Sequence, residues 1–168
     1  IDLDKILCFT ALESNCTISY NCMGKPCPDL HFSLDSGKTW KSMENVLNIE
    51  LENVGDKVYV RGNNPTGFHN TPDDYFHFIM KEKIAASGSV MSLIDGEGTT
   101  TKIPNDQCFI HLFEGCQSLT TAPELPATTA ASGCYNEMFS GCTSLRTVPQ
   151  ILPATTLASL CYHGMFRD

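Results

Sequence analysis

The sequence is poor in charge, and in positive charge most of all. Charged residues make up 18 % of its 168 residues, and 11 Lys and Arg face 19 Asp and Glu, which gives a net charge of −8. An acidic surface repels phosphate backbones, so we expect no nucleic-acid partner. No apolar run approaches the roughly 20 residues that cross a bilayer, so we expect no transmembrane helix.

Signatures of enzymes and of bound metals are also scarce. The three arginines are isolated and the five histidines are scattered along the chain. Lys38 and Thr39 follow a glycine but lack the upstream glycine of a phosphate loop. The acidic residues at 73–74 and 95–97 lack EF-hand spacing, so solvated turns explain them better than calcium. We expect no catalytic residue, no metal site and no cofactor.

Cysteine is abundant but absent between positions 27 and 108, which separates two regions. In the C-terminal region the spacings of 8, 18, 8 and 19 residues lack the close pairs of structural zinc sites, so buried apolar thiols are the favoured interpretation. In the N-terminal region Cys22 can close a small loop with Cys27, and Cys8 can pair with Cys16 across adjacent strands. Sequence alone does not choose among the three pairings of four cysteines, and either bond would suit an oxidising compartment.

The C-terminal third repeats. Residues 108–113 read Cys-Phe-Ile-His-Leu-Phe, residues 134–139 read Cys-Tyr-Asn-Glu-Met-Phe, and residues 161–166 read Cys-Tyr-His-Gly-Met-Phe. The cysteines that begin these copies set offsets of about 26 and about 27 residues, within the period typical of leucine-rich repeats.

Each repeat predicts an extended segment, a turn and a short helix. Residues 119–125 carry β-favouring threonines. Residues 130–139 place Tyr135, Met138 and Phe139 at positions i, i+3 and i+4 of a helix that Gly141 ends. One unit cannot bury its apolar face, but stacked units can. We therefore expect an α/β leucine-rich-repeat solenoid of strand, turn and short-helix units of about 26–27 residues.

The pattern Cys-Tyr-x-x-Met-Phe-x-Gly-Cys-Thr-Ser-Leu, continued by Leu-Pro-Ala-Thr-Thr, resembles the BspA-like leucine-rich-repeat surface proteins of Bacteroidetes. The resemblance covers roughly residues 103–168. It implies export, a cell-surface or extracellular setting, adhesion or ligand capture, and no catalysis. A lipid anchor on a removed N-terminal segment would fit that setting. The pattern also predicts a cysteine after Asp168, so we expect the repeats to be truncated mid-unit.

The first 95 residues predict an all-β, antiparallel, sandwich-like domain. Turn signals separate short β-rich stretches, and residues 96–107 read as a polar, glycine-rich junction before the repeats at 108–168. The fold class is thus expected to be mixed. The β-rich stretches lie at residues 6–11, 17–20, 30–34, 46–51, 57–61, 75–80 and 90–94.

Residues 33–40 match the Asp-box pattern Ser-x-Asp-x-Gly-x-Thr-Trp of sialidases and other β proteins. We expect Asp35 to accept backbone N–H groups in a hairpin turn, Gly37 to take a positive φ, and Trp40 to pack beneath. A single copy without an arginine cluster does not predict a sialidase.

The leading functional expectation is non-catalytic binding of a host or matrix protein, or of a glycan, at a cell surface. Exposed residues of the repeat strands are the candidate contacts: Thr121 and Glu124, with Thr147 and Gln150 one unit later. The alternatives are a carbohydrate-binding accessory module, for which Phe68 is the best exposed aromatic candidate, and a structural spacer of a larger surface protein.

Overall fold

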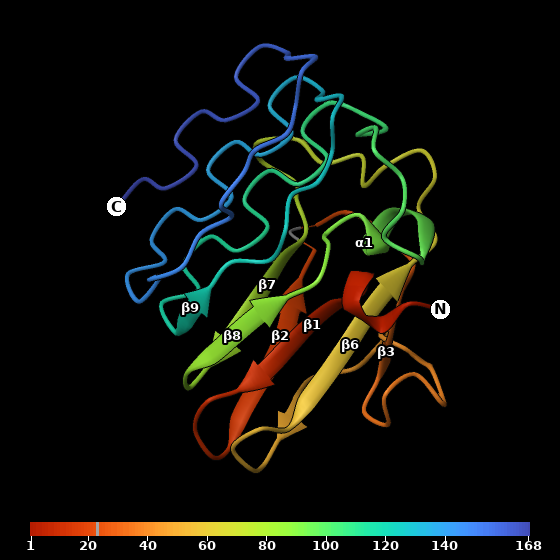
Figure 1. The fold of residues 1–168 in the computed structure, drawn as a ribbon, viewed down its shortest axis with the longest axis vertical. Coiled ribbons are helices and arrows are strands. Elements are labelled where there is room, and N and C mark those ends of the chain that lie inside the picture. The colour runs from red at the N-terminus through yellow and green to blue at the C-terminus, as the bar shows by residue number, and fades with distance from the viewer. Residues whose placement is uncertain (23) are drawn as a thin grey trace.

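Alternating apolar and polar residues in the first 90 residues produce short strands, mostly where the sequence predicts them (Figure 1). The structure is a computed structural model that describes residues 1–22 and 24–168. About a quarter of the chain is strand and little is helix. The elements are η1 Leu3–Lys5, β1 Leu7–Ala11, β2 Cys16–Asn21, β3 Leu30–Ser33, β4 Lys41–Ser42, β5 Ile49–Leu51, β6 Lys57–Gly62, β7 His77–Lys81, β8 Ile84–Ser87, α1 Ser92–Asp95 and β9 Leu119–Thr121.

The strands form two sheets. The larger has the order β4-β3-β6-β1-β8-β9 and the smaller has the order β5-β2-β7. All strand pairs are antiparallel except β8 with β9. Buried side chains of the sheets meet between them, as where Phe9 of β1 contacts Phe78 of β7 edge-on at 5.1 Å between ring centroids. Burial of such rings is the main source of stability for this part of the chain.

The stretch at 90–94 does not form a strand, so this expectation is wrong. Its last residues lie in the one-turn helix α1, which Gly96 ends in a left-handed conformation at φ 75°, as glycine commonly does after a helix. Ser92 fixes this helix to the larger sheet, because its buried hydroxyl accepts the Leu7 N–H at 3.0 Å and donates to the Val60 carbonyl at 3.1 Å. Two short strands, β4 and β8, have no counterpart in the prediction.

The predicted fold class is also wrong, because the leucine-rich-repeat solenoid of strand and helix units does not form. The structure is almost all sheet and turn, and α1 is the only α-helix in the part of the chain that it describes. The strand expected at 119–125 is confined to β9. In place of short helices, each repeat has a chain of tight turns at residues 106–115, 132–141 and 159–166, here called turn segments one, two and three.

Hydrogen bonding explains why turns replace the helices. In turn segment one the even-numbered N–H groups from Ile110 to Glu114 bond three residues back, as Leu112 does to Phe109. The odd-numbered N–H groups bond sideways to turn segment two, as His111 does to Asn136 at 3.0 Å. An α-helix would need all these N–H groups to bond four residues back. The left-handed φ of 50° at Glu137 and 73° at Gly141 breaks the right-handed helical path in turn segment two.

Aromatic rings form two columns through the turn segments. One column stacks Phe109, Tyr135 and Tyr162, at 6.2 and 5.7 Å between centroids. The other stacks Phe113, Phe139 and Phe166, at 5.4 and 5.6 Å.

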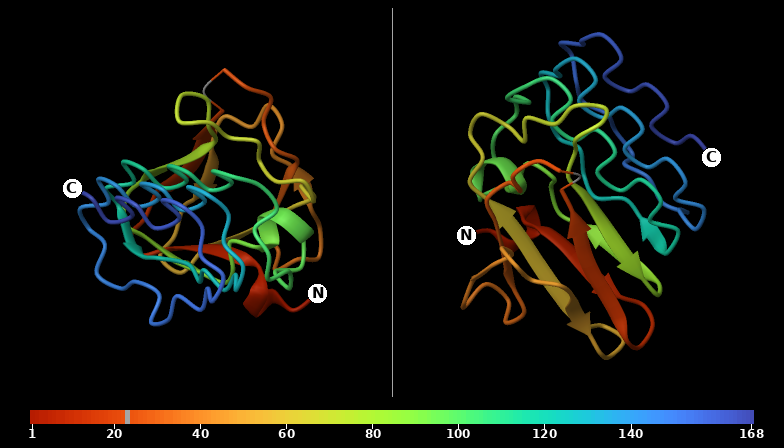
Figure 2. Two further views of the ribbon diagram at one scale, coloured as in Figure 1. Left: turned by 90° about the horizontal axis from the view of Figure 1, so that it is seen from above. Right: turned by 180° about the vertical axis from the view of Figure 1, so that it is seen from behind.

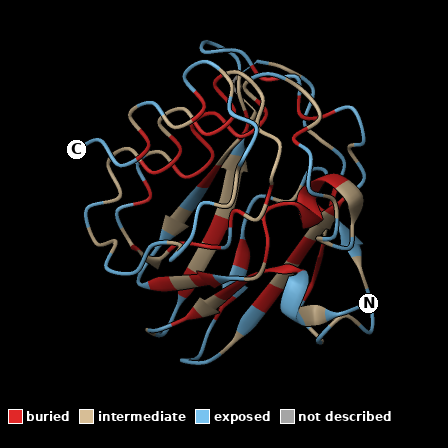
Figure 3. Ribbon diagram, turned by 45° about the horizontal axis from the view of Figure 1, so that its top comes forward, coloured by how far each residue is buried: buried red, intermediate tan, exposed pale blue. Residues whose placement is uncertain are grey.

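The second column begins in the sheets, because Phe113 stacks on Phe78 at 5.5 Å and meets Phe9 edge-on at 6.1 Å. One buried cluster therefore runs from the two sheets into the repeats. Figures 2 and 3 show the turn segments lying side by side, with their buried stretches toward the strands. Among the described residues, no helix has the length and apolar character needed to cross a bilayer.

Replacing Phe113 by Ala should destabilise the protein by about 3–5 kcal/mol, because a fully buried ring shared by the sheets and the repeats is lost. The matched control is Phe166→Ala, at the equivalent repeat position, where the ring is 47 % exposed. Urea unfolding followed by circular dichroism measures both variants. Equal losses would contradict the role of Phe113 as the link between the two regions.

Candidate functional site

The Asp-box hairpin forms as expected at Asp35 and Gly37. The Asp35 carboxylate accepts the Thr39 N–H at 2.9 Å and the Thr39 hydroxyl at 2.7 Å. These bonds, with that from Ser33, stabilise the charged form and lower the pKa of Asp35 to about 2. Gly37 has φ 80°. The Asp35 carboxylate therefore stabilises the turn, and this structural role explains the presence of the motif.

Two of the four candidate contacts in the repeats are brought together directly. Thr121 and Thr147 form a parallel bridge, and the flanking N–H of Ala122 donates to the Thr147 carbonyl at 2.9 Å. Thr147 is exposed and Thr121 is half-buried. Equivalent residues of two repeats therefore lie side by side, as the offset between the repeats predicts.

The other two candidates lie on the same two segments. Glu124 is exposed, and its backbone forms a parallel bridge with Ser89. Gln150 is exposed three residues after Thr147. Beside them are large apolar side chains that water reaches: Val148 is 42 % exposed and Ile151 is 71 % exposed. We call the surface formed by residues 119–126 and 146–152 the repeat strip.

Phe68 is not an exposed aromatic, and this expectation is wrong. Only 3 % of it is exposed, and its ring meets Phe76 and Phe109 edge-on at 5.7 and 5.5 Å. The loop around Gly67 turns the ring inward onto the first aromatic column, where the sequence suggested an outward position. Phe68 therefore belongs to the core that joins the sheets to the repeats.

Trp40 is half-buried, and one face of its ring is already covered. The Arg61 guanidinium lies 4.1 Å from the ring centroid, a cation–π contact. The ring borders an open cavity of about 320 Å³, together with His31 and Asp95. A larger open cavity of about 710 Å³ lies between residues 26–30 and 42–47.

The cysteines divide into one disulfide and seven free thiols. Cys22 is bonded to Cys27, one of the two pairings considered above, whereas Cys8 and Cys16 are buried and unpaired, so the other pairing is wrong.

Thiols of the repeats donate to carbonyls of neighbouring segments at Cys116 and Cys142, which bond to Phe78 at 3.2 Å and to Phe113 at 3.0 Å. Burial raises the pKa of Cys108 and of Cys142 to about 12 and that of Cys134 to about 11. These groups are therefore poor nucleophiles at neutral pH.

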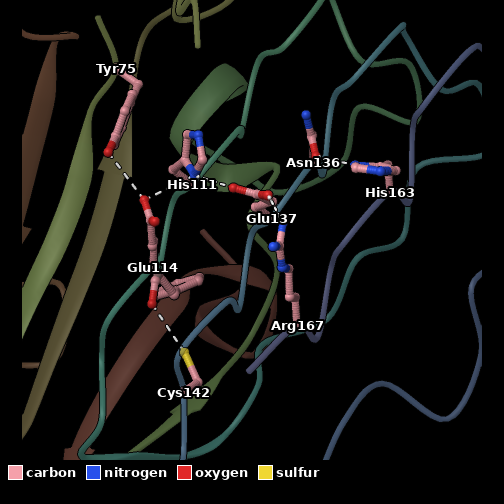
Figure 4. Close-up of polar contacts among 9 residues, drawn as sticks. Tyr75, His111, Glu114, Asn136, Glu137, Cys142, His163 and Arg167 are labelled. Atoms are coloured by element: carbon pink, nitrogen blue, oxygen red, sulfur yellow. Dashed lines mark hydrogen bonds and ion pairs between the residues drawn. The ribbon is translucent and has the colours of Figure 1, made fainter. Parts of the chain in front are cut away.

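Sequence reasoning missed a cluster of titratable groups on turn segments one and two (Figure 4). The Nδ1 atom of His111 lies 2.9 Å from Oε2 of Glu114 and 3.5 Å from Oε2 of Glu137. Glu114 accepts a hydrogen bond from the Tyr75 hydroxyl at 3.1 Å, and Oε1 of Glu137 pairs with Arg167 at 3.3 Å. The Tyr75 ring covers the imidazole, with 4.3 Å between centroids.

Burial of its ring and the nearby Glu114 carboxylate raise the pKa of Tyr75 to about 12, so its hydroxyl stays a proton donor toward Glu114. Burial also lowers the pKa of His77, which keeps this neighbouring imidazole neutral. The cluster thus brings one imidazole nitrogen and two carboxylate oxygens within 4.8 Å of one another. The scattered histidines of the sequence did not suggest this arrangement.

A signal for this cluster was present in the sequence. His111 and Glu137 occupy the same position of successive repeats, and Glu114 follows His111 by three residues. The alignment of repeats therefore places His111 beside Glu137, in the way that Asn136 meets His163 of the next repeat at 3.1 Å.

The chain has no match among models of known protein families, curated proteins or solved structures.

The thiols of Cys108, Cys134 and Cys142 should be alkylated by iodoacetamide at pH 8 at least a hundredfold more slowly in the native protein than in urea. The reasons are the raised pKa of all three thiols, which leaves little thiolate, and the burial of Cys108 and Cys134 together with the partial burial of Cys142. Mass spectrometry of proteolytic fragments measures each rate. Comparable native and denatured rates would contradict the buried arrangement of the repeat cysteines.

Proposed function

We propose that this chain is a non-catalytic binding protein of the cell surface or extracellular space, and that the repeat strip contacts a protein ligand. The observation that carries the proposal is the pairing of Thr121 with Thr147, which aligns equivalent residues of two repeats on one surface. Repeated units that align in this way make extended surfaces suited to binding.

The composition of the strip favours a protein over a glycan. Exposed Val148 and Ile151 lie among the polar residues Glu124, Thr147 and Gln150, and protein interfaces combine apolar contacts with a polar rim in this manner. Glycan sites rely on exposed aromatic faces. Residues 119–126 and 146–152 contain no aromatic residue, and Trp40 lies elsewhere with one face under Arg61.

Two further observations support export. The Cys22–Cys27 disulfide is of a kind that persists in oxidising compartments. Burial raises the pKa of the free thiols of Cys108 and Cys134, so they would resist oxidation there. The resemblance to BspA-like surface proteins, with its lipid anchor on a removed N-terminal segment, is part of this proposal.

A variant combining Thr121→Ala, Glu124→Gln, Thr147→Ala and Gln150→Ala should weaken binding to its ligand at least tenfold, because it removes the polar contacts of the strip. The ligand is first sought by screening the native chain on arrays of extracellular-matrix proteins and glycans, and affinity is then measured by surface plasmon resonance. The control variant changes four exposed residues outside the strip, by Lys38→Ala, Glu44→Gln, Glu52→Gln and Lys81→Ala, and should bind as the native chain does.

Two outcomes would overturn the proposal. Binding of a glycan that survives the strip changes and is lost in Trp40→Ala would make the N-terminal region a carbohydrate-binding module. A blank array with folded protein would favour a structural spacer.

A further inference from the structure

The cluster at His111 has the geometry of a metal site rather than of a simple ion pair. His111 is buried, with 9 % of its area exposed, and its Nδ1 atom has no hydrogen-bond partner. Oε2 of Glu114 lies only 2.9 Å away, yet the two atoms do not form a hydrogen bond, which depends on direction as well as on distance. A buried nitrogen without a hydrogen-bond partner lowers the stability of the folded state.

The distances between the donor atoms fit one shared ion. Two donors bound at about 2.1 Å, at octahedral or tetrahedral angles, lie roughly 3.0–3.4 Å apart. The Nδ1 atom of His111 lies 2.9 Å from Oε2 of Glu114 and 3.5 Å from Oε2 of Glu137, and all three donor atoms lie within 4.8 Å of one another. Figure 4 shows both carboxylates turned toward the imidazole.

Neighbouring groups hold the carboxylates in place and leave a lone pair free on each oxygen that faces His111. Arg167 pairs with Oε1 of Glu137 and leaves Oε2 directed to His111. The Tyr75 hydroxyl donates to Oε2 of Glu114, and a carboxylate oxygen has a second lone pair for an ion. Such outer partners are typical of metal sites, where they orient the ligands. Gly164 occupies the equivalent position of the third repeat, and a Cβ there would lie 3.0 Å from Cγ of Glu137.

We propose that His111, Glu114 and Glu137 bind one divalent transition-metal ion of the Zn²⁺ class. Two carboxylates balance the charge of such an ion, and an imidazole donor favours a transition metal over Ca²⁺ or Mg²⁺, which take oxygen ligands. Three protein donors leave a coordination position free. The side chains of Glu114 and Glu137 are 35 % and 23 % exposed, so solvent reaches the cluster. This site is separate from the repeat strip and does not depend on the function proposed for it.

The test titrates Zn²⁺ into the EDTA-treated, gel-filtered chain in competition with a chromophoric chelator. One equivalent should bind, and His111→Gln and Glu137→Gln should each weaken binding at least tenfold. His163→Gln, which changes an exposed histidine of turn segment three, is the matched control and should bind as the native chain does, as should the repeat-strip variant. Circular dichroism and thermal melts in EDTA check that each variant is folded.

A second readout keeps the outcome decisive if a variant folds poorly. Zn²⁺ should raise the Tm of the native chain and of His163→Gln, and not that of Glu137→Gln, while Ca²⁺ and Mg²⁺ should raise none of them. Co²⁺ should give a visible spectrum without the intense near-ultraviolet band of a thiolate ligand. The proposal is overturned by no Zn²⁺ binding, by equal binding in Glu137→Gln and the native chain, or by a thiolate band, which would place the ion at a cysteine.

Discussion

Sideways hydrogen bonds between turn segments are the constraint on which the C-terminal third depends. Every second backbone N–H leaves its own segment and bonds to the next one, as Phe113 does to Met138 at 2.9 Å. The spacing of neighbouring segments follows from these bonds, and it is what places aromatic rings 5.4–6.2 Å apart in the two columns. The pairing of Thr121 with Thr147 and the approach of Glu137 to His111 follow from the same alignment. The core, the repeat strip and the cluster at His111 are thus three results of one backbone arrangement.

Much of the burial was predictable from the sequence, whereas the local backbone conformation was not. Tyr135, Met138 and Phe139 are all buried, as a helix face would require, yet they lie on turns. A period close to four residues suits both a helix and a chain of turns in which every fourth residue has a positive φ. Gly133 and Gly141 mark two such positions, but Glu137 between them has the same conformation with no glycine to signal it. The hydrogen bonds that favour turns over a helix run between repeats. The helix propensity of the residues within one repeat gives no information about them.

The candidate site was predictable to a similar extent. Thr121 and Thr147 occupy the same position of two successive repeats, and such positions lie side by side when repeats stack. Their adjacency could therefore be predicted from the sequence. The burial of Phe68 could not, since it depends on packing against Phe76 and Phe109, which the sequence alone does not bring together. The same alignment of repeats that pairs the two threonines also pairs His111 with Glu137. They were missed because their residue types differ, so the repeat pattern treats their position as variable.

The pairing of equivalent positions also restricts how such a chain can grow by duplication. A perfect copy of one repeat would set each side chain against its own duplicate. Stacked phenylalanines gain from that arrangement, whereas two glutamates would repel each other. Selection after a duplication should therefore preserve the aromatic positions and drive the charged ones apart, toward unlike pairs. His111 beside Glu137 is an unlike pair of this kind, and the ring positions are little changed between copies.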